Sequence, residues 1–400
     1  MKSLVFLSLL VLCTACAPLG MSTVEPSPTF IATTTPASTP PLVPTATPIL
    51  LPPSPTPIFD GVIDNVAIGQ QGQVFASGYG NDLQQLAQWD GAKWIALDTG
   101  FQPASNSLAV DSAGHLYVEV LTNSQEGMSN AIMRWDGAQW EDITGNFSIE
   151  VDPLKAGRIS GNIPVMVLAL DGEDNLYAAR AFFYPTSNYI NEFPMGYVAK
   201  WNQETWTVLG EGFDKVYIHA LAISATGDVY VAGEQPLTPE GNSSFIAQWD
   251  GEKWTQIGTR KLNTIGYLAL DKSGGLYVGG LSSEPHGYIN YWDGMDWSTI
   301  AAQLGGEAPA ILDMAVDVNG QLYIGGSFES VNGIPARYIA YWDGSSWHGL
   351  AEGVDQQVNA LAFDPSGDLY AAGFFTEAGG LPVQHLARWD GEGWHALGGK

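Results

Sequence analysis

Aromatic and histidine side chains that could bind a ligand gather in three stretches of the chain. Exposed rings stack on sugars or anchor a protein partner, and a nearby histidine can exchange a proton near neutral pH. The richest stretch reads RAFFYPTSNYINEFPMGY, and the others are KVYIHALAI and EPHGYINYW. The alternative is that these rings pack beneath their own loop as a small satellite core. The candidate ligand-binding residues are Phe182, Phe183, Tyr184, Tyr189, His219, His286 and Tyr288.

The sequence carries none of the common catalytic motifs. It has no GxxxxGK[ST] phosphate loop, no GxGxxG fingerprint, no HExxH zinc motif and no GxSxG nucleophile elbow. Repeated aspartates such as Asp271, Asp317 and Asp364 stand in D-x-x-G segments, which favour turns, and none lies in a complete calcium loop. A carboxylate pair for glycoside hydrolysis stays open, because 42 acidic residues allow many pairs. We therefore expect a binding protein rather than an enzyme, with no metal or cofactor.

The charge balance excludes one class of partner. The chain has 15 Lys and Arg against 42 Asp and Glu, a formal net charge of −27. A surface this acidic repels nucleic acids and anionic lipid headgroups. Both cysteines, Cys13 and Cys16, stand near the N-terminus, so the rest of the chain has no disulfide, cysteine nucleophile or cysteine metal ligand.

Tryptophans reveal an internal repeat. All 14 fall into pairs spaced five residues apart, and six of the pairs read W-D-G-x-x-W, in which Asp-Gly favours a tight hairpin. The third copy, WNQETW, has Gln203 in place of the glycine and is expected to use a different turn. The pairs are expected to lie in the core, and they are Trp89/Trp94, Trp135/Trp140, Trp201/Trp206, Trp249/Trp254, Trp292/Trp297, Trp342/Trp347 and Trp389/Trp394.

A second hairpin repeats in phase with the tryptophans. Segments such as ALDKSGGLYVGG and AFDPSGDLYAAG run from an apolar strand through a D-x-x-G turn into a strand with an aromatic residue. Each repeat thus holds four strands, and the period matches propeller blades. The sequence predicts an all-β fold, a seven-bladed β-propeller of four-stranded antiparallel blades over residues 58–400. The first blade begins with an inner strand and the last ends with an outer one, so we expect ring closure by packing without strand exchange.

These repeats resemble the kelch-type blades of galactose-oxidase-like propellers. In that family the second strand ends in a glycine pair, as at Gly279-Gly280 and Gly325-Gly326, and the fourth strand opens with Trp. The resemblance implies the propeller fold but no particular activity, because kelch-type propellers include enzymes, adhesins and scaffolds. The copper chemistry of galactose oxidase requires a Cys crosslinked to Tyr, and the repeats contain no Cys.

The N-terminus resembles an export signal followed by a tether. Residues 1–16 contain Lys2, an apolar run and the sequence LCTAC, which is similar to a bacterial lipobox with Cys16 as the acylated residue. Cleavage after Ala17 and free secretion are the alternative. Residues 17–57 are rich in Pro and Thr, a composition typical of an extended, disordered linker.

Variable connections place the candidate site on one face of the ring. Strand parity puts the segments that join consecutive blades and the loops between second and third strands on the same face. Polar residues near the starts of inner strands, namely Asp64, Asn106, His219 and Asn359, are expected around the channel mouth. We therefore expect an exported, lipid-anchored, monomeric cell-surface module that binds an extracellular glycan or protein and contacts the membrane only through its lipid. An extracellular hydrolase or lyase with carboxylates at the channel mouth, and a passive spacer, are the alternatives.

Overall fold

The computed structural model describes residues 62–397 apart from short gaps, and every structural statement below concerns those residues. The chain divides into two units, Met1–Ser54 and Pro55–Lys400, and all described residues belong to the second. Every regular element among them is a β-strand, and none of them forms a helix able to cross a membrane. The gaps are 81–82, 125–126, 146–166, 184–193, 225, 239–240, 258–264, 281–287 and 301–302.

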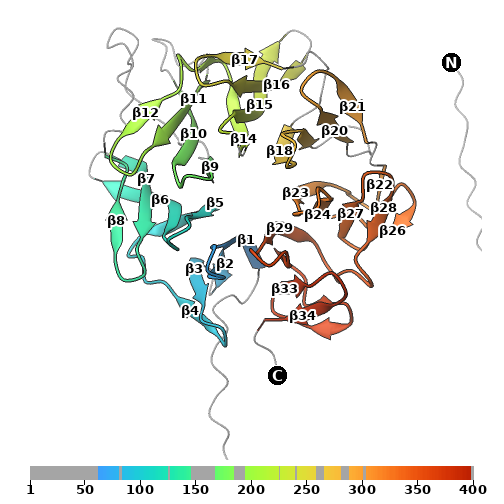
Figure 1. Ribbon diagram of the computed structural model, residues 1–400. Helices are drawn as coiled ribbons and strands as arrows, with labels where there is room; N and C mark the ends of the chain where they lie inside the picture. Colours follow the sequence, from blue (N-terminus) through green and yellow to red (C-terminus); the bar gives the residue numbers. More distant parts are fainter. Residues whose placement is uncertain are drawn as a thin grey trace, which may run out of the picture. The chain divides into compact units, whose positions relative to one another are not determined.

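Seven four-stranded antiparallel sheets stand around a common axis, one for each sequence repeat (Figure 1). The first strand of each sheet lies nearest the axis and the fourth lies at the rim. This arrangement confirms the predicted seven-bladed β-propeller. Blade 1 consists of β1 (Val62–Ile68), β2 (Val74–Gly80), β3 (Leu83–Trp89) and β4 (Trp94–Ala96), and blade 2 of β5 (Gln102–Val110), β6 (Leu116–Ser124), β7 (Gly127–Trp135) and β8 (Trp140–Asp142). Blade 3 consists of β9 (Val167–Leu170), β10 (Leu176–Phe183), β11 (Pro194–Trp201) and β12 (Trp206–Val208), and a fifth short strand, β13 (Phe213–Asp214), pairs with β11. Blade 4 consists of β14 (Tyr217–Ile223), β15 (Val229–Thr238), β16 (Gly241–Trp249) and β17 (Trp254–Gln256).

Blades 6 and 7 carry small extra hairpins between their second and third strands. In blade 6 the hairpin turns at Asn332 and Gly333, whose φ angles of 52° and 78° suit a two-residue turn. The remaining strands are β18 (Ile265–Leu270), β19 (Leu276–Gly280), β20 (Tyr288–Trp292), β21 (Trp297–Thr299) in blade 5; β23 (Ile311–Val316), β24 (Leu322–Gly326), β27 (Ile339–Trp342), β28 (Trp347–Gly349) in blade 6, with β22 (Leu304–Gly305), β25 (Ser330–Val331) and β26 (Ile334–Pro335); and β29 (Val358–Phe363), β30 (Leu369–Gly373), β33 (Leu386–Trp389), β34 (Trp394–Ala396) in blade 7, with β31 (Glu377–Ala378) and β32 (Leu381–Pro382).

Among the described residues, which begin at Val62, the ring closes without strand exchange, as predicted. Blade 1 consists of β1 to β4, and blade 7 of β29, β30, β33 and β34, so neither borrows a described strand from the other. Val62 and Ile63 pair with Tyr79 and Gly78 inside blade 1. At the seam, Ile63 packs in one buried cluster with Leu386 of blade 7. Packing therefore closes the ring.

The hydrophobic core lies between the blades. The described residues form seven buried clusters, and each joins one blade to the next around the ring. Because a single four-stranded blade buries little by itself, each blade depends on both neighbours for its stability.

The Trp pairs lie at the edge of these clusters. Trp201, Trp347 and Trp394 are buried and the other 11 rings are half-buried, and all 14 belong to or pack against the buried clusters, in agreement with the predicted core position. The second Trp of several pairs donates its indole N–H to a carbonyl that follows the fourth strand of the preceding blade. Trp254 Nε1 bonds Leu209 O at 2.7 Å, and Trp140, Trp206 and Trp394 make equivalent bonds. These residues therefore stabilise contacts between blades as well as filling space.

The Asp-Gly turns behave as their sequence predicts, with one exception. In blade 1, Asp90 Oδ1 accepts hydrogen bonds from the backbone N–H of Ala92 and Lys93, and Gly91 takes a φ of 96°. The expectation of a different turn in blade 3 is wrong. Gln203 takes a φ of 76°, and the same closing bond runs from Asn202 N to Thr205 O. An L residue thus occupies a conformation that costs it energy.

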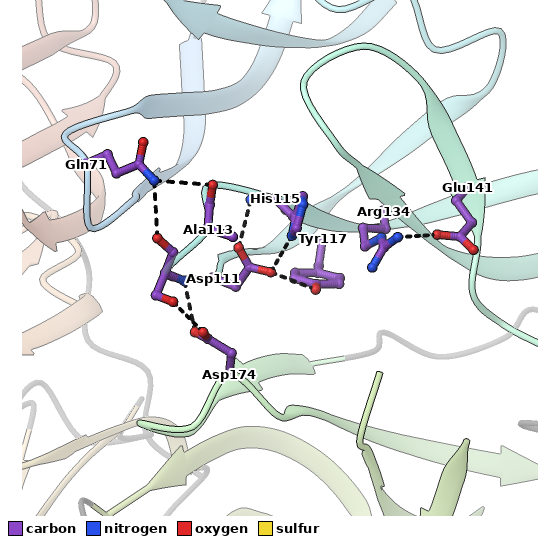
Figure 2. Close-up of polar contacts among 9 residues, drawn as sticks. Gln71, Asp111, Ala113, His115, Tyr117, Arg134, Glu141 and Asp174 are labelled. Atoms are coloured by element: carbon purple, nitrogen blue, oxygen red, sulfur yellow. Dashed lines mark hydrogen bonds and ion pairs between the residues drawn. The ribbon is translucent and has the colours of Figure 1, made fainter. Parts of the chain in front are cut away.

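The D-x-x-G segments are turns, as predicted. Oδ1 of Asp271 accepts from the backbone N–H of Ser273 and Gly275, and Asp317 and Asp364 make the same pair of bonds. Figure 2 shows how such turns join blades 1 to 3: Gln71 donates to the carbonyls of Ser112 and Ala113, and Ser112 N donates to Asp174 at 2.8 Å.

Candidate functional site: an acidic cavity at the ring axis

A β-bulge interrupts the inner strands at one common position. The pairing register skips one residue in five blades, and a wider irregularity falls between Pro103 and Leu108 in β5. A bulge re-aims side chains and bends the strand, and it frequently lies beside a functional site. The skipped residues are Asp64, His219, Gly266, Leu312 and Asn359.

A cavity of about 670 Å³ lies among these bulges. Tyr79 pairs with Val62 and Glu234 with Tyr217, so the cavity opens near the starts of the inner strands. That is the face of the blade-to-blade connections and of the loops between second and third strands, as strand parity predicts. The polar and aromatic lining residues are Asp64, Asn65, Tyr79, His219, Glu234, Tyr267, Asp313 and Asn359.

Asp313 is the most enclosed carboxyl group of the lining. It belongs to β23, and its Oδ2 accepts a hydrogen bond of 2.7 Å from Leu361 N in the next blade, while Oδ1 accepts from Met314 N at 2.8 Å. Protein surrounds the carboxyl group, and part of the residue faces the cavity. Burial raises its pKa to about 7, because the two N–H donors offset only part of the lost hydration. The carboxyl is therefore partly protonated near neutral pH.

The same inter-blade contact occurs once more with a neutral residue. In blade 2, Ser107 Oγ accepts from Leu168 N of blade 3 at 2.8 Å. Ser107 lies at the end of the irregular stretch of β5, directly before Leu108, and Asp313 directly follows the bulge of β23. A hydroxyl is thus sufficient for the structural bond, and the charge of Asp313 is an addition that the fold does not require.

A second carboxyl group lies at the seam between blades 7 and 1. Asn359 Nδ2 donates to Ile63 O at 3.3 Å and lies 3.5 Å from Asp64 Oδ1. Asp64 Oδ2 is shielded from solvent and has no hydrogen-bond partner among the described residues. Burial raises the pKa of this carboxyl as well.

The third acidic group stands beside His219. Nε2 of His219 lies 3.7 Å from Glu234 Oε1, and the imidazole stacks on the Tyr217 ring at a centroid distance of 6.4 Å. Burial, followed by the charge of Glu234, raises the pKa of Tyr217. On the next blade, burial and then the charge of Asp313 raise the pKa of Tyr267 to about 12, so this phenol stays neutral.

The structure places only part of the predicted site. His219 lines the cavity, as do Asp64 and Asn359. Phe182 and Phe183 extend β10, opposite Met195 and Pro194, and Tyr288 begins β20, but the side chains of these three are not described. Tyr184, Tyr189 and His286, with Cys16 and the 17–57 linker, lie outside the described residues, and so does the side chain of Asn106.

One ring of the aromatic stretch is core. Tyr197, the last residue of that stretch, is buried in β11 with its hydroxyl 3.0 Å from Met195 Sδ, so it is not part of a ligand-facing loop.

Sequence reasoning missed five polar and aromatic lining residues. Tyr79 lies near the end of β2 and Glu234 within β15, and the other three, Asn65, Tyr267 and Asp313, directly follow bulges. Asp313 had a usable signal, since ILDMAV is an apolar inner strand interrupted by one charge. Tyr79 had no such signal, because it follows the repeated glycine, which is Gly78 in blade 1, at a position where other repeats carry varied residues such as Glu234 and Phe374.

A second titratable cluster lies on the opposite face. His115 Nδ1 is 2.7 Å from Asp111 Oδ2, which also accepts from the Tyr117 hydroxyl at 2.9 Å (Figure 2). Asp111 Oδ1 simultaneously accepts from His115 N at 2.8 Å, the bond that closes the turn. This triad therefore belongs to the turn. No cluster of three or more His, Cys, Asp or Glu able to hold a metal occurs among the described residues.

Comparisons with known proteins support the fold. The sequence matches no family model and no curated protein. Among solved structures, YCF48 bound to D1 peptide aligns with a TM-score of 0.51 at 14% identity, covering 84% of this chain and 93% of that one. The β-propeller domain of the Trilobed protease from Pyrococcus furiosus, described as having an open velcro topology, aligns with a TM-score of 0.51 at 14% sequence identity. The alignment covers 84% of this chain and 97% of that domain.

A larger protein contains the same fold. The acylaminoacyl peptidase of Pyrococcus horikoshii aligns with a TM-score of 0.51 at 15% identity, covering 84% of this chain but only 52% of the peptidase. The chain thus spans about half the length of that protein. Identities this low establish a β-propeller and nothing about activity.

Proposed function

We propose that this protein is an extracellular binding module whose ligand enters the axial cavity. The observation that carries the proposal is the cavity itself, in which repeated bulges bring Asp64, His219 and Asn359 to one opening. Ligand sites are concave and combine apolar walls with a few convergent polar groups. The sequence contains none of the common catalytic motifs beside these residues. The ligand class is a glycan or a protein.

Three further parts of the proposal rest on sequence. The aromatic stretch with Phe182, Phe183, Tyr184 and Tyr189, together with His286 and Tyr288, forms the wall beside the cavity. The repeats are kelch-type, and residues 1–57 export the chain, anchor it through acylated Cys16 and hold the ring away from the membrane. YCF48, a propeller of similar fold, binds a peptide, which supports the interaction role.

The experiment is a screen of the full chain against glycan and protein arrays, followed by calorimetry with each hit. Tyr79, which is 46% exposed at the cavity, is the residue to change. Losing one contact ring typically weakens binding several-fold, so Tyr79→Ala should raise the Kd by about fivefold or more with an unchanged melting temperature. Met295→Ala, at an 84% exposed rim position, is the matched control. Equal affinities for both variants would place the site elsewhere.

One observation favours a second candidate, an extracellular carbohydrate-active hydrolase or lyase. Two carboxyl groups with raised pKa, Asp64 and Asp313, line the same cavity, and glycoside cleavage uses such an acid beside an ionised partner. Incubation with polysaccharides would detect released sugars. If the protein is such an enzyme, Asp313→Asn should abolish the release of sugars. The enzyme function would be excluded if the wild type released none.

A further inference from the structure

Two of the three carboxyl groups in the cavity are engaged by the protein itself. His219 Nε2 lies 3.7 Å from Glu234 Oε1, which gives Glu234 a basic neighbour inside the cavity. Both oxygens of Asp313 accept backbone hydrogen bonds, from Leu361 N at 2.7 Å and from Met314 N at 2.8 Å. The charge of these carboxyl groups therefore does not identify the ligand, and the neutral side chains of the lining are more informative.

Three neutral polar side chains of the lining are uncommitted. They are the amide of Asn65 and the phenol hydroxyls of Tyr79 and Tyr267, and none of these groups forms a hydrogen bond with a described residue. Asn65 directly follows the bulge of β1 and Tyr267 follows that of β18, so the same irregularity carries both residues to the axis. Tyr79 lies near the end of β2, opposite Val62, where its ring is 46% exposed.

These groups need both donors and acceptors from a ligand. An amide offers two N–H donors and an acceptor oxygen, and each phenol offers one donor with acceptor capacity. Beside them, Asp64 Oδ2 is an acceptor without a donor among the described residues. An ammonium or guanidinium group only donates and an ionised carboxylate or phosphate only accepts, so either kind of ion leaves part of this set unpaired. A hydroxyl donates and accepts through one oxygen, so several hydroxyls satisfy the whole set.

We propose that the cavity binds a neutral oligosaccharide, with one sugar ring stacked on Tyr79 and its hydroxyls bonded to Asn65, Tyr267 and Asp64. This inference rests on the proposed binding function and narrows its ligand class from a glycan or a protein to a glycan without charged groups. A pyranose ring has a face of C–H groups that packs on an exposed aromatic ring such as that of Tyr79. The cavity volume of about 670 Å³ lies within the range of about 300 to 1,000 Å³ that is usual for small-ligand sites, which leaves room for a short oligosaccharide.

Charged sugars and peptides fit these observations less well. An acidic sugar is repelled by the three carboxyl groups of the lining and by the net charge of −27. An amino sugar is attracted to them, but its ammonium group cannot accept a hydrogen bond from Asn65 or Tyr267. A peptide backbone carries its donors and acceptors on separate atoms, so one peptide unit satisfies fewer of the lining groups than a sugar ring with several hydroxyls does.

The test is calorimetry of the full chain with neutral tetrasaccharides derived from glucans, galactans, mannans and xylans. We expect at least one of them to bind once per ring. Its Kd should change less than about twofold between about 0.05 and 0.5 M salt, because salt does not screen a ligand without charge. The uronic-acid and amino-sugar analogues with the same ring configuration should bind at least about fivefold more weakly. An end-capped tetraserine peptide, which carries hydroxyls on a peptide backbone, should show no measurable binding.

Variants that remove single groups locate the bound sugar. Tyr267→Phe deletes only a hydroxyl and Asn65→Ala deletes the amide, and each should raise the Kd for the bound tetrasaccharide about threefold to tenfold through lost hydrogen bonds. Tyr79→Phe keeps the ring, so it should raise the Kd less than Tyr79→Ala does. Melting temperatures report whether each variant still folds.

Matched controls stand at the ends of third strands, on the face away from the cavity. Tyr341→Phe removes a phenol hydroxyl from β27, where Tyr341 pairs with Tyr323. Gln248→Ala removes a half-buried amide from β16, where Gln248 pairs with Thr255. Both should change the Kd less than about twofold. Equal losses in cavity and control variants, or stronger binding of a charged analogue or of tetraserine than of every neutral tetrasaccharide, would overturn the inference.

The outcomes separate this inference from the proposed function. A protein from the array whose affinity falls with Asn65→Ala, together with no binding by any neutral tetrasaccharide, would refute the glycan class and leave the axial binding site standing. No binding by any tetrasaccharide and no array hit would overturn both.

Discussion

At the scale of single residues, Asp313 both makes an inter-blade hydrogen bond and lines the cavity, whereas Ser107 in blade 2 makes the equivalent bond with a neutral hydroxyl. The side-chain Oδ2 of Asp313 accepts the hydrogen bond from Leu361 N that joins β23 to β29, and the residue also lines the cavity. Because the buried carboxyl has a raised pKa, the folded protein retains a proton that the unfolded chain releases at a lower pH. Ionisation of Asp313 therefore weakens the fold.

Asp313→Asn should change the pH dependence of stability. In the wild type this group makes the free energy of unfolding fall as pH rises from about 4 towards the folded pKa of about 7, because the unfolded state binds fewer protons there. The variant lacks this contribution, so its stability relative to wild type should improve across that window by on the order of 2 to 3 kcal/mol. Urea unfolding at several pH values measures it, and Asp296→Asn controls for the loss of one exposed charge. Parallel curves for wild type and Asp313→Asn would contradict the prediction.

At the scale of elements, the bulge and the glycine opposite it form one unit. A Cβ on Gly233 would lie 1.8 Å from Tyr217 O, and one on Gly326 would lie 1.9 Å from Ala310 O, both just before a bulge. In blades 2 and 3 the position of this glycine in the second strand is occupied by Val120 and Arg180. In blade 2 the inner strand shows the wider irregularity. The glycine therefore allows the close approach that gives the bulge its regular form.

Gly233→Ala should disrupt the bulge that carries His219. The added methyl group collides with backbone, so the strand must shift, at a cost of about 1 to 3 kcal/mol. Chemical denaturation measures the loss. Gly172→Ala, where an added Cβ meets nothing within 4 Å, should stay within about 0.5 kcal/mol of wild type. A similar loss for both variants would contradict the prediction, because it would show that the close approach at Gly233 is not the cause.

The turn of blade 3 allows a reciprocal exchange. Gln203→Gly should stabilise the protein by about 0.5 to 1 kcal/mol, because glycine adopts the φ of 76° without steric cost. Gly251→Gln, at the same position of blade 4 with a φ of 101°, should destabilise it by a similar amount. Thermal unfolding of both variants checks the pair, and a loss of stability in Gln203→Gly would show that the glutamine makes a compensating contact.

At the scale of the whole molecule, the ring closes between blades 7 and 1 without a strand shared between the two described blades. Side-chain packing and the bonds of Asn359 join the two blades at this seam. Ring opening at this seam would separate Asp64 from Asn359, so cavity and closure depend on the same contacts.

Ile63→Ala should open the seam preferentially. Ile63 is fully buried between the two blades, and its truncation leaves a cavity that costs about 3 kcal/mol. Amide exchange should accelerate first in β1 and β29. Ile334→Ala, at a 44% exposed position, should change stability by less than about 0.5 kcal/mol. Exchange that accelerates evenly around the ring would show that the seam is no weaker than the other interfaces.

The sequence by itself determined the architecture, because the Trp pairs and D-x-x-G turns recur with every blade and local turn chemistry sets each hairpin. It also indicated the correct face and three polar residues of the cavity, since strand parity follows from the order of strands. Only the tertiary structure decided which side chains meet there. Asp64 and Asp313 lie 249 positions apart in the sequence, and they share a cavity because ring closure brings β1 beside β29, which in turn packs against β23. The pKa of Asp313 depends in the same way on enclosure by neighbouring blades, which no local pattern encodes.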